Sequence, residues 1–234
     1  MTFPPRGLFI TGTDTGVGKT YVGAIVARAL SAAGMRVGVY KPVASGCRRE
    51  RDSLVSGDAT VLWEAAGRPG ELDAVCPQRF AAPLAPHLAA RAEGRAVDAE
   101  RLAGGLAWWS NRCDVVLVEG AGGLMSPLTD DLYNADLAGQ FGYPLLVVAP
   151  NRLGVINQTL QTLIAAAALG EGLTVAGVVL NDVSPAGDDA SLAGNFDELT
   201  ARCGPPVLTH VRHGERRDTR RDVELFRGLV SSQS

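Results

Sequence analysis

The amino-acid sequence predicts one α/β domain over residues 1–234, a doubly wound and mostly parallel sheet with helices on both faces. Two observations carry this prediction. Short apolar runs alternate with longer helical stretches along the chain, which is the order of strand–helix–strand units. The runs are also continuously apolar, as expected of strands buried on both faces of a parallel sheet. The chain has 234 residues, of which 46% are hydrophobic, and this is enough for one large core.

The apolar runs are the expected strands, and longer stretches between them are the expected helices. The strands are residues 7–11, 37–41, 114–119, 144–149, 174–181 and 206–211. The helices are residues 19–33, 58–66, 98–110, 135–141, 154–169 and 188–202. Gly34 follows the first of these helices, in the position where a glycine commonly ends a helix. A charged run after Gly214 is interpreted as the solvated start of a further helix.

The composition indicates no nucleic-acid partner and no membrane partner. Charged residues make up 20% of the chain and the net charge is −3, so there is no basic field to attract nucleic acid or anionic lipid. The apolar stretches are short and contain glycine or proline, so none fits a transmembrane helix. Residues 1–6 are too few and too polar for a signal peptide. We therefore expect a cytoplasmic protein.

The cysteines are scattered along the chain. They are Cys47, Cys76, Cys113 and Cys203. No two of them form a CxxC pair and the chain has three histidines, which argues against a structural zinc site or a disulfide framework. We expect reduced thiols in or near the core.

A glycine-rich loop follows the first expected strand and opens the first expected helix. Residues 12–20 have the sequence GTDTGVGKT, which matches a phosphate-binding loop at its Gly-Lys-Thr end. The glycines let backbone N–H groups approach a phosphate, and the helix start adds partial positive charge. Lys19 would reach the β- and γ-phosphates, and the Thr20 hydroxyl would ligate Mg²⁺. Five residues separate Gly12 from Gly18 where four are usual, so the loop is a variant form; a glycine turn formed by chance is the alternative.

Two carboxylates and a lysine are further candidates for the same site. Glu119 ends an apolar run and precedes Gly-Ala-Gly-Gly, which is a suitable place for a ligand of Mg²⁺ beside a phosphate. Asp58 is a second candidate ligand, although an ordinary helix cap would give the same pattern. Lys41 closes the second expected strand, at the sheet edge where ligands bind in this fold class. Its spacing alone fits either a lysine in the same cleft or a surface lysine before a proline turn.

Taken together, the motifs resemble one enzyme family. GTDTGVGKT is followed in order by KPVASG, VEGAGG and LND, with APH and RLGVIN at residues 85–87 and 152–157. This combination, over about residues 9–182, resembles the dethiobiotin synthetases. The resemblance implies a ligase of biotin biosynthesis that uses ATP and Mg²⁺ to join CO₂ to 7,8-diaminopelargonic acid. One amine takes up CO₂ as a carbamate, ATP phosphorylates the carbamate, and the second amine closes the ring of dethiobiotin with loss of phosphate.

The resemblance also implies roles for individual residues. The catalytic residues would be Lys41, Lys19, Thr15 and Ser45. The nucleotide contacts would be Gly16, Val17, Gly18, Lys19, Thr20, Tyr21, Asp58, Glu119, Gly120, Ala121, Gly122, Asn181, Asp182, Arg212, His213 and Gly214. The ligands of Mg²⁺ would be Thr20, Asp58 and Glu119. The substrate would be bound by Ser45 and, across the interface of a homodimer, by the helix-start amides of Gly154, Val155, Ile156 and Asn157.

Two positions depart from the pattern of the family. Gly16 stands where many members have glutamate, so one carboxylate contact is missing. Residues 209–214 replace a Gly-Glu-Ile-Pro-like run that touches the adenine and the ribose. The base preference therefore stays open, with Asn181 as the expected contact to the base.

Three alternatives share the predicted fold. A partition or septum-positioning ATPase, which is a dimerising switch, would carry a second lysine early in the loop, where this chain has Asp14. A ligase or amidotransferase acting on cobyrinic acid would need a glutamine-handling domain, for which the chain is too short. An inactive homologue would not be expected to keep all of the candidate phosphate and metal ligands.

Overall fold

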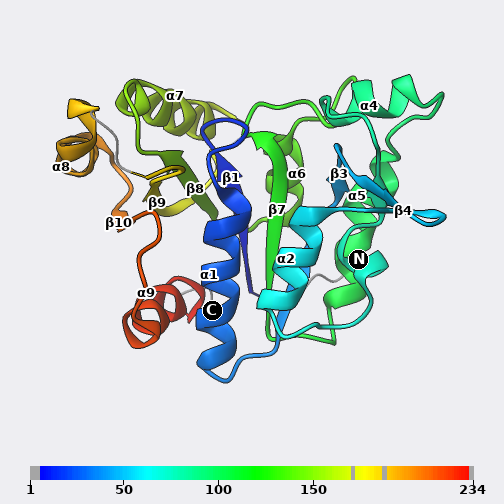
Figure 1. Ribbon diagram of the computed structural model, residues 1–234, viewed down its shortest axis with the longest axis horizontal. Helices are drawn as coiled ribbons and strands as arrows, with labels where there is room; N and C mark the ends of the chain where they lie inside the picture. Colours follow the sequence, from blue (N-terminus) through cyan, green and yellow to red (C-terminus); the bar gives the residue numbers. More distant parts are fainter. Residues whose placement is uncertain (1–5, 170–171, 186–188, 232–234) are drawn as a thin grey trace.

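The computed structural model describes residues 6–169, 172–185 and 189–231. Its centre is a sheet of six parallel strands in the order β10-β9-β8-β1-β7-β2 (Figure 1). The strands are β1 (Gly7–Gly12), β2 (Val37–Tyr40), β7 (Val115–Gly123), β8 (Leu145–Pro150), β9 (Val175–Asn181) and β10 (Val207–Val211). Each corresponds to one of the expected strands, so the prediction of a doubly wound, parallel α/β fold is confirmed.

The central strands are buried on both faces, which explains their continuously apolar sequence. Every residue of β1, β2 and β8 is buried. Phe9 in the middle of β1 lies beside Val118 of β7 on one side and Leu145 of β8 on the other. Because the strands are parallel, their carboxyl ends meet at one edge of the sheet, and the loops that follow them gather there.

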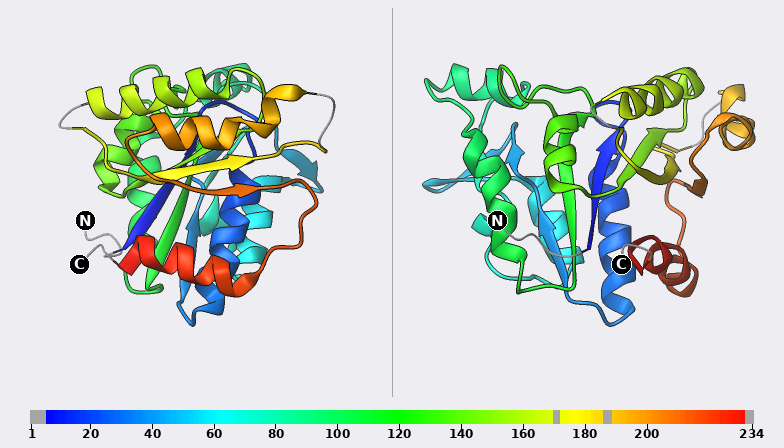
Figure 2. Two further views of the ribbon diagram at one scale, coloured as in Figure 1. Left: turned by 90° about the vertical axis from the view of Figure 1, so that its left-hand side faces the viewer. Right: turned by 180° about the vertical axis from the view of Figure 1, so that it is seen from behind.

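Helices cover both faces of the sheet. They are α1 (Lys19–Ala32), α2 (Gly57–Ala65), α3 (Leu72–Val75), α4 (Pro86–Ala92), α5 (Ala99–Gly104), α6 (Asn134–Phe141), α7 (Val155–Ala168), α8 (Asn195–Arg202) and α9 (Thr219–Ser231), with the 3₁₀ helices η1 (Gly105–Trp109) and η2 (Ala190–Ala193). In Figure 1, α2, α1 and α9 lie side by side in front of the sheet and α6 lies behind it. Figure 2 shows the same layers from the side and from behind. Within the described residues, no helix combines the length and the apolar character needed to cross a membrane.

Two expected helices are each divided in the structure. The stretch 98–110 forms α5 and then η1, which begins at Gly105. Gly105 lies against the buried ring of Tyr40, whose hydroxyl would be 2.3 Å from an added Cβ, so only a glycine permits this close approach. The stretch 189–202 forms η2 and then α8, with Gly194 between them. Residue 188, where this helix was expected to begin, lies outside the described residues.

The short elements were not predicted, because they carry too few residues for a periodic pattern. α3 has 4 residues and α4 has 7. Two small ribbons flank the main sheet: β3 (Val43–Ala44) pairs with β6 (Gln78–Arg79), and β4 (Arg48–Glu50) pairs with β5 (Ser53–Val55). The first ribbon continues the chain that leaves β2 and so fixes the segment that carries Lys41.

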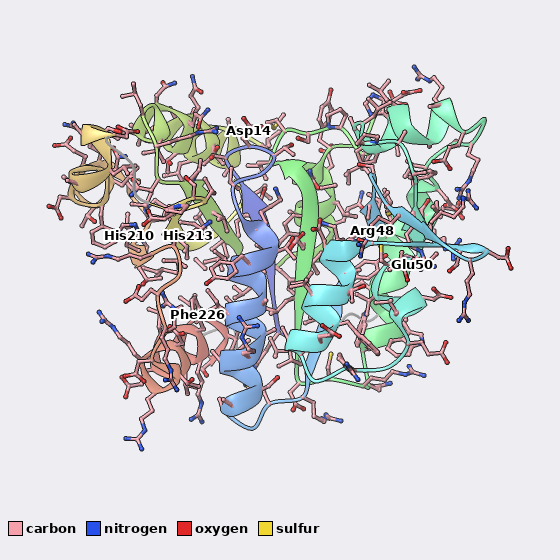
Figure 3. All side chains as sticks on the ribbon, viewed as in Figure 1. Asp14, Arg48, Glu50, His210, His213 and Phe226 are labelled. Carbon is pink, nitrogen blue, oxygen red and sulfur yellow. The ribbon has the colours of Figure 1, made fainter. Side chains whose placement is uncertain are left out.

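The charged run after Gly214 leads into the C-terminal helix and is exposed except at Arg217 and Asp222, so its interpretation as a solvated helix start is largely confirmed. α9 begins at Thr219, packs against α1 and buries Phe226 and Val230 completely. Figure 3 shows Phe226 between these two helices. Arg217 and Asp222, also from the charged run, form a largely buried ion pair of 2.5 Å. The charges therefore surround a helix that belongs to the core.

Two smaller expectations are confirmed. Gly34, which follows the C-cap residue Ala33 of α1, has a positive φ of 81°. All of the cysteines are free thiols, and only Cys203 is more than slightly exposed. Burial raises the pKa of Cys76 to about 12 and that of Cys113 to about 11, so both stay protonated at neutral pH.

Candidate functional site

The glycine-rich loop connects β1 to α1 at the carboxyl edge of the sheet, and Figure 3 shows Asp14 on it. Gly16 and Gly18 have positive φ angles of 73° and 92°. A Cβ added to Gly18 would lie 2.1 Å from Nδ2 of Asn181, whereas one added to Gly16 would meet nothing within 4 Å. Gly18 is therefore required by space and by conformation, and Gly16 by conformation alone. A backbone that turns in this way is the cradle that a phosphate needs.

Lys19 lies within the curve of this loop. Its Nζ donates a hydrogen bond of 3.2 Å to the backbone oxygen of Asp14, and the residue is only 7% exposed. Burial lowers the pKa of Lys19, and the positive charge of Lys41 acts in the same direction, while Glu119 opposes them. A second, negatively charged partner such as a phosphate would stabilise this ammonium group.

Lys41 forms the centre of a buried ionic cluster. Its Nζ lies 2.5 Å from Oε1 of Glu119 and 3.1 Å from Oδ2 of Asp58. The Thr20 hydroxyl donates to the same Oε1 of Glu119 at 3.0 Å. Lys41 is 3% exposed and Glu119 is 1% exposed, so this pair is removed from water. The structure thus places four of the predicted site residues in direct contact, and the alternative of a surface lysine at position 41 is wrong, because this side chain is buried against Glu119.

The electrostatics of the cluster favour the charged forms. Burial alone would lower the pKa of Lys41, but the charges of Glu119 and Asp58 outweigh burial and raise it. The same attraction to Lys41 lowers the pKa of Asp58 against the effect of burial. Lys41 is therefore an ammonium and Asp58 a carboxylate at neutral pH.

Asp58 is free to join this cluster because another residue caps its helix. The side chain of Ser56 accepts a hydrogen bond of 3.2 Å from the backbone N–H of Ala59, so Ser56 is the N-cap of α2. The alternative that Asp58 is an ordinary helix cap is therefore wrong. Its carboxylate, in the first turn of α2, faces Lys41 instead.

The residues of this cluster fit a magnesium ion. Glu119 Oε2 is buried and has no hydrogen-bond partner, and an unpaired buried carboxylate oxygen is costly unless a cation or donor meets it. Carboxylate and hydroxyl oxygens are the ligands that Mg²⁺ prefers. In the part of the chain that the structure describes, no three His, Cys, Asp or Glu side chains converge as a metal-binding group. Two carboxylates and Thr20 would therefore leave the other positions to phosphate and water, as is usual for this ion.

Asn134 shapes the glycine loop after Glu119, and the sequence analysis missed it. Its Nδ2 donates to the backbone oxygens of Ala121 at 2.7 Å and Gly123 at 2.9 Å, and its Oδ1 accepts from the Ala121 N–H at 3.1 Å. Gly122 in this loop has a φ of 83°. An asparagine one residue after an isolated bridge has no recognisable motif, so only the contacts reveal this role.

The far end of the candidate nucleotide site is built from the ends of β8, β9 and β10. Asn181 donates from Nδ2 to the backbone oxygen of Val17 at 3.0 Å, and its buried Oδ1 has no partner. Asp182 accepts from Asn151 at 2.8 Å and bonds to His210 at 2.7 Å. Burial works against ionisation of Asp182, but the hydrogen bonds from His210 and Asn151 prevail and lower its pKa. The carboxylate of Asp182 thus already has hydrogen-bond partners within the protein.

A cavity of about 990 Å³ adjoins these strand ends. Asp182, His210 and Arg212 line it, together with Phe196, whose ring stacks on His210 at 6.3 Å between centroids. His213, labelled in Figure 3, is exposed and is not among the residues that line this cavity. The next residue, Gly214, is also exposed. Tyr21 lines a separate, smaller cavity of about 220 Å³ beneath α9. The predicted nucleotide contacts at this end are therefore less closely gathered than those around Lys41.

The predicted substrate residues lie on two segments, the chain after Lys41 and the start of α7. Ser45 is half-buried in the segment after Lys41. Residues 154–157 form the start of α7, where Gly154 has a φ of 91° and precedes the first helical turn. Arg152 approaches the carboxylate of Asp14 at 4.0 Å, which brings the start of α7 next to the phosphate loop. A helix start at this place is suited to an anion.

The parallel sheet and its phosphate loop define the class of the protein as a P-loop nucleotide-binding protein. Residues 6–217 match the family model described as an AAA domain. The ATP-dependent dethiobiotin synthetase BioD of Rhodopirellula baltica is 46% identical over 215 residues, which cover 87% of this chain and 83% of that protein. The enzyme of the same name from Anaeromyxobacter dehalogenans is 47% identical over 194 residues, which cover 83% of this chain and 84% of that one. The chain therefore belongs to the dethiobiotin synthetase family.

A solved structure of another function shares the fold. The septum site-determining protein MinD from Pyrococcus horikoshii superposes with a TM-score of 0.53 at 17% identity, covering 98% of this chain and 94% of that one. Such a likeness concerns the fold alone. The identity to dethiobiotin synthetases is much higher, so the partition or septum-positioning alternative loses its support.

Proposed function

We propose that the protein is an ATP-dependent dethiobiotin synthetase, which closes the cyclic urea of dethiobiotin from 7,8-diaminopelargonic acid and CO₂. The observation that carries the proposal is the buried cluster of Lys41, Glu119, Asp58 and Thr20 beside the loop that holds Lys19. In this reaction the carbamate, the γ-phosphate and the mixed anhydride are all anions. Two ammonium groups in a site shielded from water suit a series of crowded anions.

The covalent steps need no nucleophile from the protein. A substrate nitrogen forms a bond to the carbon of CO₂ and loses a proton, which gives the carbamate. A carbamate oxygen then attacks the γ-phosphorus, and the bond from that phosphorus to ADP breaks. Finally the second amine attacks the carbamate carbon and expels inorganic phosphate. Lys19 and Lys41 would hold the phosphoryl and carbamate oxygens in position, and proximity would supply much of the rate.

Magnesium is the proposed metal, held by Thr20, Asp58 and Glu119. When bound, it would neutralise phosphate charge as the phosphoryl group is transferred. Support comes from the oxygen donor set and from the unpaired, buried Oε2 of Glu119. Thr15, near Gly122 of the glycine loop, is the proposed neighbour of the carbamate and phosphates.

We also propose a homodimer in which the start of α7 in one subunit binds the carboxylate tail of the substrate held by the other. Residues 154–157 offer backbone amides at a helix start, and Ser45 offers a hydroxyl in the segment after Lys41. Leu153 is 79% exposed and Ile164 is 67% exposed, so apolar side chains next to and on α7 are available to an interface. Sedimentation that finds only a fully active monomer would exclude this arrangement. Because the reaction consumes ATP, the cytoplasm is the proposed location.

The test is product formation from 7,8-diaminopelargonic acid, bicarbonate, Mg²⁺ and ATP, analysed by mass spectrometry. We expect dethiobiotin from the wild type and a loss of at least about 10²-fold for Lys41→Ala, because a buried charge next to the reacting anions is removed. Arg36→Ala is the matched control, since it also removes a cation, but from an exposed pair with Asp114. Wild-type protein that forms no dethiobiotin with any nucleoside triphosphate would refute the proposal.

A further inference from the structure

Lys41 is in direct contact with two of the candidate metal ligands. Its ammonium lies within hydrogen-bond distance of Glu119 and of Asp58, and it shares Oε1 of Glu119 with the Thr20 hydroxyl. These are the residues that the proposed function assigns to Mg²⁺. A metal–oxygen distance of about 2.1 Å requires lone pairs that are directed at the metal. Oε2 of Glu119 is open to a metal, but Oε1 of Glu119 and Oδ2 of Asp58 already contact the ammonium. A dication on the same two carboxylates would repel the Lys41 charge at contact distance.

We propose that the Lys41 ammonium and Mg²⁺ compete for the carboxylates of Asp58 and Glu119. When the metal binds, the ammonium leaves these carboxylates and turns toward the anionic substrates. The inference rests on the proposed function, because it takes these carboxylates as the metal ligands. It adds a step to that function: Lys41 acts on the substrates only after it gives up its contacts with the carboxylates.

Lys19, the other lysine of the site, differs from Lys41 in its hydrogen-bond partner. Lys19 is similarly buried and feels the charges of Glu119 and Asp58, yet its hydrogen bond goes to a backbone oxygen of its own loop. Lys19 can therefore remain in place while a dication binds nearby. Lys41 loses two ionic partners in the same event.

The position of Lys41 in the fold permits its ammonium to exchange partners, from the two carboxylates to the substrates. This change of partners is called the exchange below. It follows β2 directly and precedes β3, and both strands hold its backbone in place. The four-carbon stem of a lysine can redirect the ammonium without a change in the backbone. Ser45, the proposed substrate contact, lies four residues further along the same segment. An ammonium released from the carboxylates thus remains close to the place proposed for the substrate.

The exchange predicts that removing the Lys41 charge tightens metal binding. The probe is Mn²⁺, whose free concentration is read by electron paramagnetic resonance in the full-length protein without nucleotide. We expect Lys41→Met to bind Mn²⁺ at least about tenfold more tightly than the wild type, because a contact charge at this distance opposes the dication strongly. Lys19→Met is the matched control: it removes the same charge at a greater distance from the carboxylates and is expected to tighten binding less.

The outcomes separate the exchange from the proposed function. If Lys41→Met binds Mn²⁺ no more tightly than Lys19→Met, the exchange is refuted, whatever the activity of the wild type. If Lys41→Met binds Mn²⁺ more tightly while the wild type forms no dethiobiotin, the exchange stands and the assigned reaction falls. Circular dichroism confirms that each variant is folded before it is titrated.

A second measurement uses the wild type alone. The chain contains two lysines, Lys19 and Lys41, against twenty arginines. Protein labelled with ¹³C at lysine Cε therefore gives only two side-chain signals, which the spectrum of Lys41→Arg assigns. Titration with Mg²⁺ is expected to shift the Lys41 signal more than the Lys19 signal. A Lys41 signal that does not move while metal binds would overturn the proposal even if the Met variant cannot be folded.

Discussion

The two ends of the candidate nucleotide site are built in different ways. At the phosphate end, Lys19, Lys41 and Glu119 are each at most 7% exposed, and Lys41 and Glu119 belong to one network with Thr20. At the base end, Asp182 and His210 form a pair on the wall of an open cavity. The members of the first arrangement contact one another directly, whereas the second borders a cavity of about 990 Å³. The family-like motifs of the sequence likewise gather at the phosphate end, and the departure from the family pattern falls at residues 209–214.

The largest effect is expected from Glu119→Ala, which tests the buried network at the phosphate end. The change leaves Lys41 buried with only the half-exposed Asp58 as partner, and we expect a loss of about 3–5 kcal/mol in the free energy of unfolding. Unfolding in urea, followed by circular dichroism, measures the loss.

The double variant Glu119→Ala with Lys41→Met is the control for that loss. Because it removes both charges, it is expected to be more stable than Glu119→Ala alone. A double variant that is less stable than the single one would show that the loss comes from packing and not from an unpaired ammonium.

A smaller but more local effect is expected in the phosphate loop. Gly18→Ala would place a Cβ against Nδ2 of Asn181 at a φ of 92°, and we expect a cost of about 2–4 kcal/mol and a loss of ATP binding. Gly16→Ala, at a φ of 73° with open space around the Cβ, is expected to cost about 1 kcal/mol. Calorimetric titration with ATP compares the two variants. Equal effects would mean that conformation alone, and not contact with Asn181, determines the need for glycine.

The smallest effect belongs to the base end. Asp182→Asn removes the charge that accepts hydrogen bonds from His210 and Asn151, at an expected cost of about 1 kcal/mol at pH 7. Because the pKa of Asp182 is lowered in the folded protein, the advantage of the wild type is complete above the ordinary value of 3.8. It is lost as the pH falls through the lowered value. Melting temperatures of both proteins from pH 7 to pH 3 test this, and a difference that grows toward acid would contradict it.

The parts of the molecule that repeat a simple pattern were predictable from sequence. Continuous apolar runs gave the strands of the main sheet, and the parallel order explains why Lys41 and Glu119, which lie 78 residues apart, meet at one edge. The role of Asn134 was not predictable, because a single asparagine that holds a loop by its side chain leaves no periodic signal. The same is true of the pair between Asp182 and His210. The burial of α9 was hidden by the charges of its first turns, since Phe226 and Val230 are too few to outweigh them in sequence.

Both lysines of the chain are buried, so a lysine-specific protease has little access to them in the folded protein. A protease that cuts only after lysine has two places to cut, and each lies in a buried segment next to the phosphate loop or β2. The many surface arginines offer it nothing. Cleavage by such an enzyme would therefore report the opening of this one region, while a protease specific for arginine would report on the rest of the surface.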